Sequence, residues 1–239
     1  MRLNLFLSKS GIASRRKSDE LIFAGKIKVN NEVVTTPGTN IDELKDKVMY
    51  NNKILKIENK KYFIFNKPIN VVTTVKDPQN RKTVINFFKK VNFRLFPVGR
   101  LDYDSSGLLF LTNDGDFSNK LMHPSKNKNK IYLVTVTREL TKKQLNLFKK
   151  GIKIENKKTS NSNIILLNKK GNLCNYKVVI HEGMNRQIRK MFKYFNSNVL
   201  KLKRVEIAGI KLGNLKEGEY RELTKNEYNK LMEIRWSYL

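Results

Sequence analysis

Hydrophobic and polar residues follow two different patterns along this 239-residue chain. The first pattern combines short helical signals with a hairpin. Ser14 is a suitable N-cap for a helix over residues 15–24, and Gly25 is a suitable terminator. Asn30 and Asn31 then stand between two short apolar runs and tolerate the positive φ of a tight hairpin turn.

The second pattern begins near residues 57 to 61, where recurring apolar strands separated by Asn, Gly and Pro replace the helical signals. We therefore expect an N-terminal domain over residues 1–58 and a second domain over residues 59–239. The strands of the second domain are expected over residues 62–65, 70–74, 95–98, 107–112, 131–137, 163–167, 175–180 and 199–207.

Helices of the second domain have recognisable start signals or a helical period. Thr141 and Thr224 each precede a Gln or Glu by three residues, which is the pattern of a capping box. In "EGMNRQIRKMFKYF" apolar residues recur at helical spacing, while Arg186 and Arg189 belong to a second, basic face. Because few helices separate the strands, we expect an α+β fold with a mainly antiparallel sheet.

The chain is strongly basic, with 49 Lys and Arg against 21 Asp and Glu, a formal net charge of +28 and a pI near 10.1. This balance favours a polyanionic partner such as nucleic acid. Lysine outnumbers arginine and asparagine is frequent, so part of the charge can reflect an A+T-rich genome, and a solvated surface is the alternative. Arg15, Arg16 and Lys17 stand in a first helical turn, where the helix dipole disfavours cations, and this favours contact with phosphate.

Several classes of function lack their motifs in this sequence. There is no P-loop, no G-x-G-x-x-G after a strand and no G-x-S-x-G. A single cysteine, Cys174, with only His123 and His181, predicts no metal site and excludes a zinc deaminase. No stretch approaches the roughly 20 apolar residues of a membrane span, and no signal-peptide pattern is present, so we expect a cytoplasmic protein without a membrane partner.

One acidic loop stands out in this basic chain. Residues 99–116 read "GRLDYDSSGLLFLTNDGD", and within them the acidic loop, residues 102–106, places Asp102 and Asp104 directly before an apolar run. Each aspartate can simply cap a turn. However, loops at strand ends commonly carry functional sites, and a carboxylate without metal ligands is more suited to nucleophilic than to metal-assisted chemistry.

These residues and two further stretches resemble a known family. "VGRLDYDSSGLLFLTNDGD", "NKIYLVTV" and "EGMNRQIRKMF" are similar to the signature stretches of the RsuA/RluB/RluE/RluF family of ribosomal RNA pseudouridine synthases. The N-terminal segment resembles the S4 RNA-binding domain, a small α-L module that most members carry. "KDPQNRKTVINFF" and "FSNKLMHPS" resemble the RluB branch, which modifies the peptidyl-transferase region of large-subunit RNA.

The resemblance implies a role for each site residue. Asp102 corresponds to the catalytic nucleophile, Tyr132 to the tyrosine that stacks on the target base and can serve as a general base, and Arg189 to the basic residue that pairs with the catalytic carboxylate. The route stays open: Asp102 can attack the sugar or the base, or Tyr132 can take a sugar proton to give a glycal. Asp104 matches no universal position, so a turn role is expected for it. A buried carboxylate is costly unless a cation accompanies it, and Arg189 is expected to supply this pairing to Asp102. The candidate RNA contacts are Arg15, Arg16, Lys17, Arg100 and Arg186.

The implied reaction is isomerisation of a uridine to pseudouridine, which has no net redox change and requires no cofactor. We expect ribosomal RNA as the partner, 23S in preference to 16S, and a monomeric enzyme. Two other readings stay open. A non-catalytic RNA-binding or ribosome-assembly protein would retain the fold, and an S4-bearing RNA methyltransferase is disfavoured by the missing glycine-rich cofactor loop.

Overall fold

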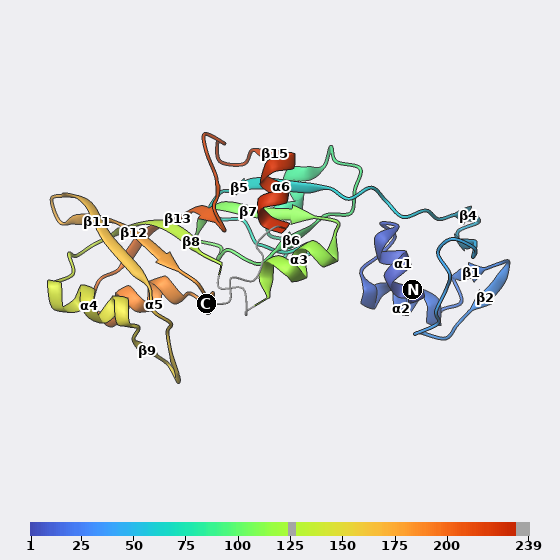
Figure 1. Cartoon of the computed structure of the whole chain (residues 1–239), viewed down its shortest axis with the longest axis horizontal. Helices are drawn as coiled ribbons and strands as arrows, with labels where there is room; N and C mark the ends of the chain where they lie inside the picture. The colour runs from blue at the N-terminus through green and yellow to red at the C-terminus, as the bar shows by residue number, and fades with distance from the viewer. Residues whose placement is uncertain (124–127, 233–239) are drawn as a thin grey trace. The chain divides into compact units, whose positions relative to one another are not determined.

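The computed structural model describes residues 1–123 and 128–232 and divides the chain into two compact units. The first unit comprises Met1–Lys61 and Lys90–Phe96, and the second comprises Tyr62–Lys89 and Pro97–Leu239. Figure 1 labels their helices and strands. Each unit has its own hydrophobic core, so each is described separately.

The first unit combines two helices with a small sheet. Helix α1 spans Leu3–Lys9 and α2 spans Arg15–Phe23. As expected, the Ser14 side chain caps α2 by accepting a hydrogen bond from the Lys17 amide at 3.3 Å. The sheet has the order β2-β1-β3-β4, formed by β1 (Ile27–Val29), β2 (Glu32–Val34), β3 (Val48–Tyr50) and β4 (Lys53–Ile54).

A nine-stranded sheet forms the centre of the second unit, with its main path in the order β11-β12-β8-β13-β7-β5-β15. All neighbours on this path are antiparallel except β13 and β7, which are parallel. The expected α+β class with a mainly antiparallel sheet is confirmed. The strands of this sheet are β5 (Tyr62–Lys67), β6 (Phe96–Val98), β7 (Ser106–Thr112), β8 (Lys130–Val136), β11 (Asn163–Lys170), β12 (Leu173–Ile180), β13 (Val199–Ile207), β14 (Ile210–Lys211) and β15 (Tyr220–Glu222).

Helices cover different parts of this sheet (Figure 1). Helices α4 (Lys142–Lys150) and α5 (Gln187–Tyr194) pack on β12 through the rings of Phe148, Phe192 and Tyr176, with centroids 5.2 and 5.6 Å apart. Helices α3 (Gly115–Met122) and α6 (Lys225–Met232) pack on β7 and β5. The remaining elements are the 3₁₀ helix η1 (Val84–Phe88) and the hairpin of β9 (Lys153–Ile154) and β10 (Lys157–Lys158).

Strand β7 is the most deeply buried strand of this unit. All seven of its residues are buried. On one side, η1 packs against the Phe63 and Phe65 rings of the neighbouring strand β5, and on the other side α3 and α6 pack on the sheet. A strand covered on both faces is a continuous apolar run rather than an alternating one. This burial explains the apolar sequence "GLLFL". It also holds β7, the strand that follows the acidic loop, firmly within the sheet.

Candidate active site

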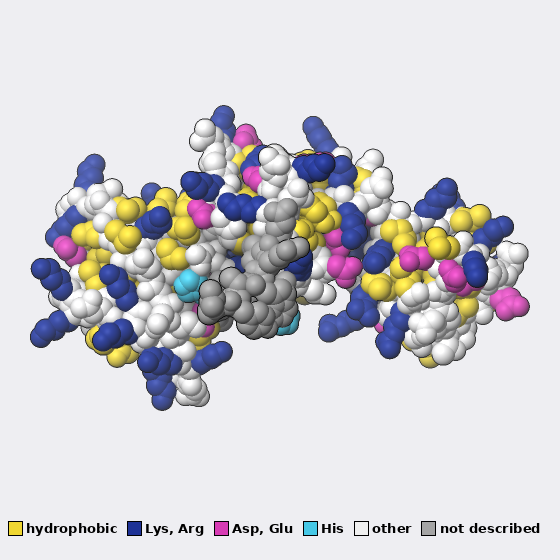
Figure 2. Space-filling model, in the orientation of Figure 1, with side chains coloured by type: hydrophobic (Ala, Val, Ile, Leu, Met, Phe, Trp, Pro, Cys, Tyr) yellow, Lys and Arg dark blue, Asp and Glu magenta, His cyan; other side chains and the backbone are white. Residues whose placement is uncertain are grey.

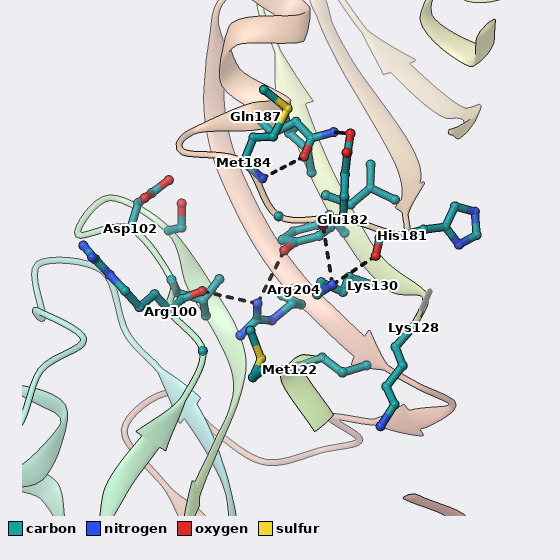
Figure 3. Close-up of a pocket in the computed structure, with 18 of the residues that line it drawn as sticks. Arg100, Asp102, Met122, Lys128, Lys130, His181, Glu182, Met184, Gln187 and Arg204 are labelled. Carbon is teal, nitrogen blue, oxygen red and sulfur yellow. Dashed lines mark hydrogen bonds between the residues drawn. The ribbon is translucent and has the colours of Figure 1, made fainter. Parts of the chain in front are cut away.

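A cavity of about 560 Å³ opens in the second unit beside the acidic loop (Figure 3). Its walls come from the loop before β7, from β8 and β13, and from the connection between β12 and α5. The polar and charged side chains that line it include Arg100, Asp102, Ser105, His123, Lys128, Lys130, Tyr132, His181, Glu182, Asn185, Arg186, Gln187 and Arg204.

The acidic loop is anchored by the segment expected as a strand over residues 70–74. This expectation is wrong: apart from a single bridge at Val72, the segment forms no strand. Its polar groups bind the acidic loop instead. The Thr73 hydroxyl donates to the Leu101 carbonyl at 2.7 Å, and the Asn70 amide donates to the Tyr103 carbonyl at 2.8 Å.

Asp102 lies at the cavity, and its side chain is partly buried. Its carbonyl accepts a hydrogen bond from the Ser105 amide at 3.1 Å, which closes a turn of the loop. The Asp102 carboxylate makes no hydrogen bond or ion pair within residues 1–123 and 128–232. This carboxylate is therefore available to a molecule in the cavity.

The expected pairing of Arg189 with Asp102 is not present, because Asp104 takes this guanidinium. The Arg189 Nε lies 3.3 Å from Asp104 Oδ2, and its Nη2 donates to the Asp104 carbonyl at 2.7 Å. Arg189 is absent from the cavity lining and also donates to the Val199 carbonyl at 3.0 Å. The turn between the two acids directs Asp104 towards α5 and leaves Asp102 at the cavity.

Asp104 thus joins the acidic loop to the start of α5. Arg186 donates to both Asp104 carboxylate oxygens, at 3.1 and 2.8 Å. Burial alone would raise the pKa of Asp104, but the Arg186 hydrogen bond and the Arg189 charge hold this pKa below its usual value. Asp104 therefore has a larger role than the turn role expected from the sequence, and Arg186, expected to contact RNA, has an acidic partner at the cavity mouth.

Tyr132 lies on β8 opposite the acidic loop. Only 7% of this residue is exposed, and it lines the cavity. Its hydroxyl accepts a hydrogen bond from Arg204 at 3.5 Å (Figure 3). The structure thus places Asp102, Tyr132, Arg100 and Arg186 around one cavity.

Two buried cations beside the site were missed by the sequence analysis. Lys67 is fully buried and donates to the Ser105 carbonyl at 2.8 Å and to the Pro68 carbonyl at 2.9 Å. Burial lowers the pKa of Lys67 to about 8, against the opposing charges of Asp102 and Asp104. Arg204 is 4% exposed and donates to Leu108, Arg100 and Tyr132. Both residues were missed because the sequence around a single basic residue in a strand does not indicate that the residue is buried.

Arg15, Arg16 and Lys17 belong to the first unit, where all three are exposed in the first turn of α2. Lys17 forms an ion pair with Glu20. Lysine and arginine side chains also outnumber acidic ones on the face of the molecule drawn in Figure 2. Arg15, Arg16 and Lys17 are candidates for RNA phosphate contacts on the first unit.

Neither a metal cluster nor a membrane helix appears in the described part of the chain. Residues 1–123 and 128–232 contain no group of three or more His, Cys, Asp or Glu that could hold a metal ion. Within the same residues no helix has the length and apolar character needed to cross a bilayer.

Comparison with known proteins supplies the family. The model of the RNA pseudouridylate synthases matches residues 61–194, and the S4 domain model matches residues 1–48. The chain belongs to the RNA pseudouridine synthase family. Its second unit is the synthase fold, and it carries an S4 domain at its N-terminus, as the sequence motifs indicate.

Individual relatives of this synthase extend over nearly the whole chain. Ribosomal large subunit pseudouridine synthase B of Bacillus subtilis (strain 168) is 42% identical over 96% of this chain and 95% of the relative. Dual-specificity RNA pseudouridine synthase RluF of Escherichia coli (strain K12) is 34% identical over 98% of this chain and 79% of the relative. A crystal structure of a pseudouridylate synthase, 30% identical, matches with a TM-score of 0.69 over 97% of this chain and 99% of that one.

Proposed function

We propose that this pseudouridine synthase isomerises one uridine of 23S ribosomal RNA, with Asp102 as the nucleophile and without a cofactor. The observation that carries the proposal is the unpaired Asp102 carboxylate at a cavity otherwise rich in cations, with Tyr132 across from it. The name of the Bacillus subtilis relative supports the large subunit as the source of the substrate. Such a substrate places the enzyme in the cytoplasm, where we expect it to act as a monomer.

The reaction moves one glycosidic bond. The C1′–N1 bond of the uridine breaks, the uracil turns while it stays in the cavity, and C1′ bonds to C5. The proton on C5 leaves and N1 gains a proton, so atoms and charge balance without any redox step. In this proposal an oxygen of the Asp102 carboxylate bonds to the sugar or the base as the C1′–N1 bond breaks, and this bond to Asp102 breaks again once C1′ is joined to C5. The oxygen needs no activating base because an aspartate is ionised at neutral pH.

The uridine must leave its RNA stack before a carboxylate can reach it. An aromatic platform holds a flipped base with roughly 1–3 kcal/mol of stacking energy. We assign this role to Tyr132, whose buried position at the cavity wall suits a base that is enclosed on one side. Arg100 is exposed at the rim of the same cavity, where its side chain can bind the displaced backbone phosphate.

Arg189 acts indirectly in this proposal. It holds Asp104 and the loop backbone, and Arg186 holds the same carboxylate from the cavity side. The two arginines therefore fix the loop that carries Asp102. Arg186 can also exchange Asp104 for an RNA phosphate, because its ion pair is 43% exposed on the arginine side.

The proposal predicts which uridine label leaves the RNA. The purified protein is incubated with 23S and with 16S transcripts that contain C5-tritiated uridine, with no cofactor added. Release of tritium from the 23S transcript is expected, because only bond formation at C5 displaces that label. A 23S transcript labelled at C5 of cytidine is the matched control and should retain its label.

Each other outcome identifies a different function. Release from the 16S transcript alone would transfer the proposal to the small subunit. RNA binding without release from either transcript would contradict the proposal and favour a non-catalytic assembly protein. Mapping the modified nucleotide by carbodiimide treatment and primer extension would then locate the uridine.

A further inference from the structure

Strand β13 separates the two parts of the active site. It pairs in parallel with β7, which follows the Asp102 loop, and antiparallel with β8, which carries Tyr132. Arg204 is the β13 residue in register with both Gly107 on β7 and Tyr132 on β8. Because β7 and β8 do not pair with each other, β13 determines how far apart their residues lie.

The Arg204 side chain binds oxygen atoms on both sides of this gap. Its Nε donates to the Leu108 carbonyl at 2.8 Å, and its Nη1 donates to the Arg100 carbonyl at 3.4 Å and to the Tyr132 hydroxyl at 3.5 Å. Arg100 and Leu108 flank the acidic loop, and Figure 3 shows the hydrogen bond between Arg204 and Arg100. One side chain therefore connects both ends of the Asp102 loop with Tyr132.

Stability does not explain a guanidinium at this position. Arg204 is 4% exposed, and it has no carboxylate partner within the described residues. Burying a cation costs several kcal/mol, and an apolar side chain of similar volume is often neutral or better for stability. The Arg204 charge also affects a neighbour. The pKa of Lys130 is lowered first by the burial of Lys130 and then by the nearby positive charge of Arg204.

The chemistry of the hydrogen bond to Tyr132 fixes the direction of the tyrosine proton. A guanidinium is only a donor, so the Tyr132 oxygen must accept. The phenolic hydrogen must then point away from Arg204, and since Tyr132 lines the cavity, this hydrogen is available to a bound nucleotide. Both Nη1 distances lie at the long end of hydrogen-bond geometry, and we expect them to shorten when RNA fills the cavity.

We propose that Arg204 is a positioning residue that holds the Tyr132 hydroxyl in place relative to the Asp102 loop. The proposal rests on the proposed function, because it takes Asp102 and Tyr132 as the groups that meet the uridine. A lysine at this position keeps the charge but cannot reach three oxygens from a rigid fork.

The test measures single-turnover pseudouridine formation with excess protein on a transcript that the wild-type protein modifies. Arg204→Lys should slow the reaction about 100-fold, the scale expected when reacting groups are misplaced by about 1 Å. The dissociation constant for the RNA should stay within about threefold of the wild-type value, and the melting temperature should be nearly unchanged. Lys203→Arg is the matched control, because Lys203 neighbours Arg204 on β13 but does not line the cavity.

A double variant shows whether Arg204 acts through the tyrosine. With Tyr132→Phe already present, Arg204→Lys should slow the reaction far less than it does alone, because the hydroxyl that it positions is gone. Long incubations with excess protein make slow rates measurable. The proposal would be overturned if Arg204→Lys reacted within threefold of the wild-type rate, or if it weakened only RNA binding or folding. It would also be overturned if the double variant were slowed by the product of the two single-variant factors.

Asp102→Asn, measured in parallel, separates this inference from the proposed function. An active Asp102→Asn protein would refute the nucleophile, and with it the role of Arg204 in positioning Tyr132 relative to the Asp102 loop. A fully active Arg204→Lys protein beside an inactive Asp102→Asn protein would refute the positioning role alone.

Discussion

Three buried or half-buried cations bind the backbone of the loop that carries Asp102 or the residues that flank it. Lys67 donates to the Ser105 carbonyl, Arg189 to the Asp104 carbonyl, and Arg204 to the carbonyls of Arg100 and Leu108. None of the three forms a hydrogen bond or ion pair with the Asp102 carboxylate. The cations therefore hold the loop in place and leave this carboxylate to the substrate.

Lys67 predicts a pH dependence of stability. Its pKa is about 8 in the folded protein, lowered first by burial, against an ordinary value of 10.5. Between these pH values the unfolded chain binds more protons than the folded one, so Lys67 makes the free energy of unfolding rise with pH. The free energy of unfolding of Lys67→Met, relative to that of the wild-type protein, should therefore fall as the pH rises from 7.5 to 10.

Urea unfolding of both proteins across this range measures the difference. Lys201→Met, which removes an exposed lysine of the same unit, should show a difference from wild type that does not vary with pH. If the difference between Lys67→Met and wild type is also constant with pH, Lys67 does not titrate near 8.

The sequence identified some residues of this site and could not identify others. Asp102 and Tyr132 belong to long motifs, and the structure places both at the cavity. The partner of Arg189 was predicted wrongly, because only the turn of the loop decides which of two aspartates faces the helix. Lys67 and Arg204 were missed because burial of a lone cation depends on contacts between distant strands.

At the scale of elements, the start of β7 depends on a close approach to β13. Gly107 has φ of +108°, and a Cβ there would lie 2.1 Å from the Arg204 carbonyl oxygen. A side chain at this position would be strained by the positive φ and would clash with the β13 backbone. The strand that follows the Asp102 loop is therefore fixed against the strand that carries Arg204.

Gly107→Ala should lower the free energy of unfolding by more than ~1 kcal/mol, because alanine at this positive φ is strained and its Cβ meets the β13 backbone. It should also slow catalysis, because β7 must move away from β13. Gly115→Ala is the control, since Gly115 begins α3 without a positive φ and nothing lies within 4 Å of its added Cβ. Equal stability of the two variants in chemical unfolding would show that the β7–β13 approach is not constrained.

Elements with local signals were predicted well from the sequence. The capping box of Thr141 and Gln144 is present at the start of α4, and α2 and α5 form within the expected residues. Arg186, expected on the basic face of the helix, instead precedes α5 in a left-handed conformation. Helix α3 was missed, because "NDGD" has the composition of a turn although the Asp114 side chain caps the helix. The segment 70–74 was wrong for a tertiary reason: its polar groups bind the acidic loop.

For the whole molecule, the net charge of +28 favours binding of RNA, whose uridine must reach the Asp102 carboxylate in the proposed reaction. Arg15 and Arg16, exposed on the S4 domain, are proposed phosphate contacts. Replacing both with Gln should reduce the slope of log K against log salt by about 0.9 for each lost duplex contact.

Fluorescence binding titrations over a range of salt concentrations measure this slope. Lys53→Gln with Lys56→Gln removes two exposed charges from the same unit and should leave the slope unchanged. An identical slope in the wild-type protein and the Arg15/Arg16 variant would place the phosphate contacts elsewhere.

The central claim is that Asp102 is the nucleophile of this pseudouridine synthase. The most direct measurement is tritium release from C5-labelled uridine RNA by Asp102→Asn, compared with Asp104→Asn from the same loop. Asp102→Asn should bind the RNA as tightly as the wild-type protein and release no label. Asp104→Asn, which loses its ion pairs but retains the nucleophile, should be slower yet active. Appreciable turnover by the Asp102→Asn protein would contradict the account.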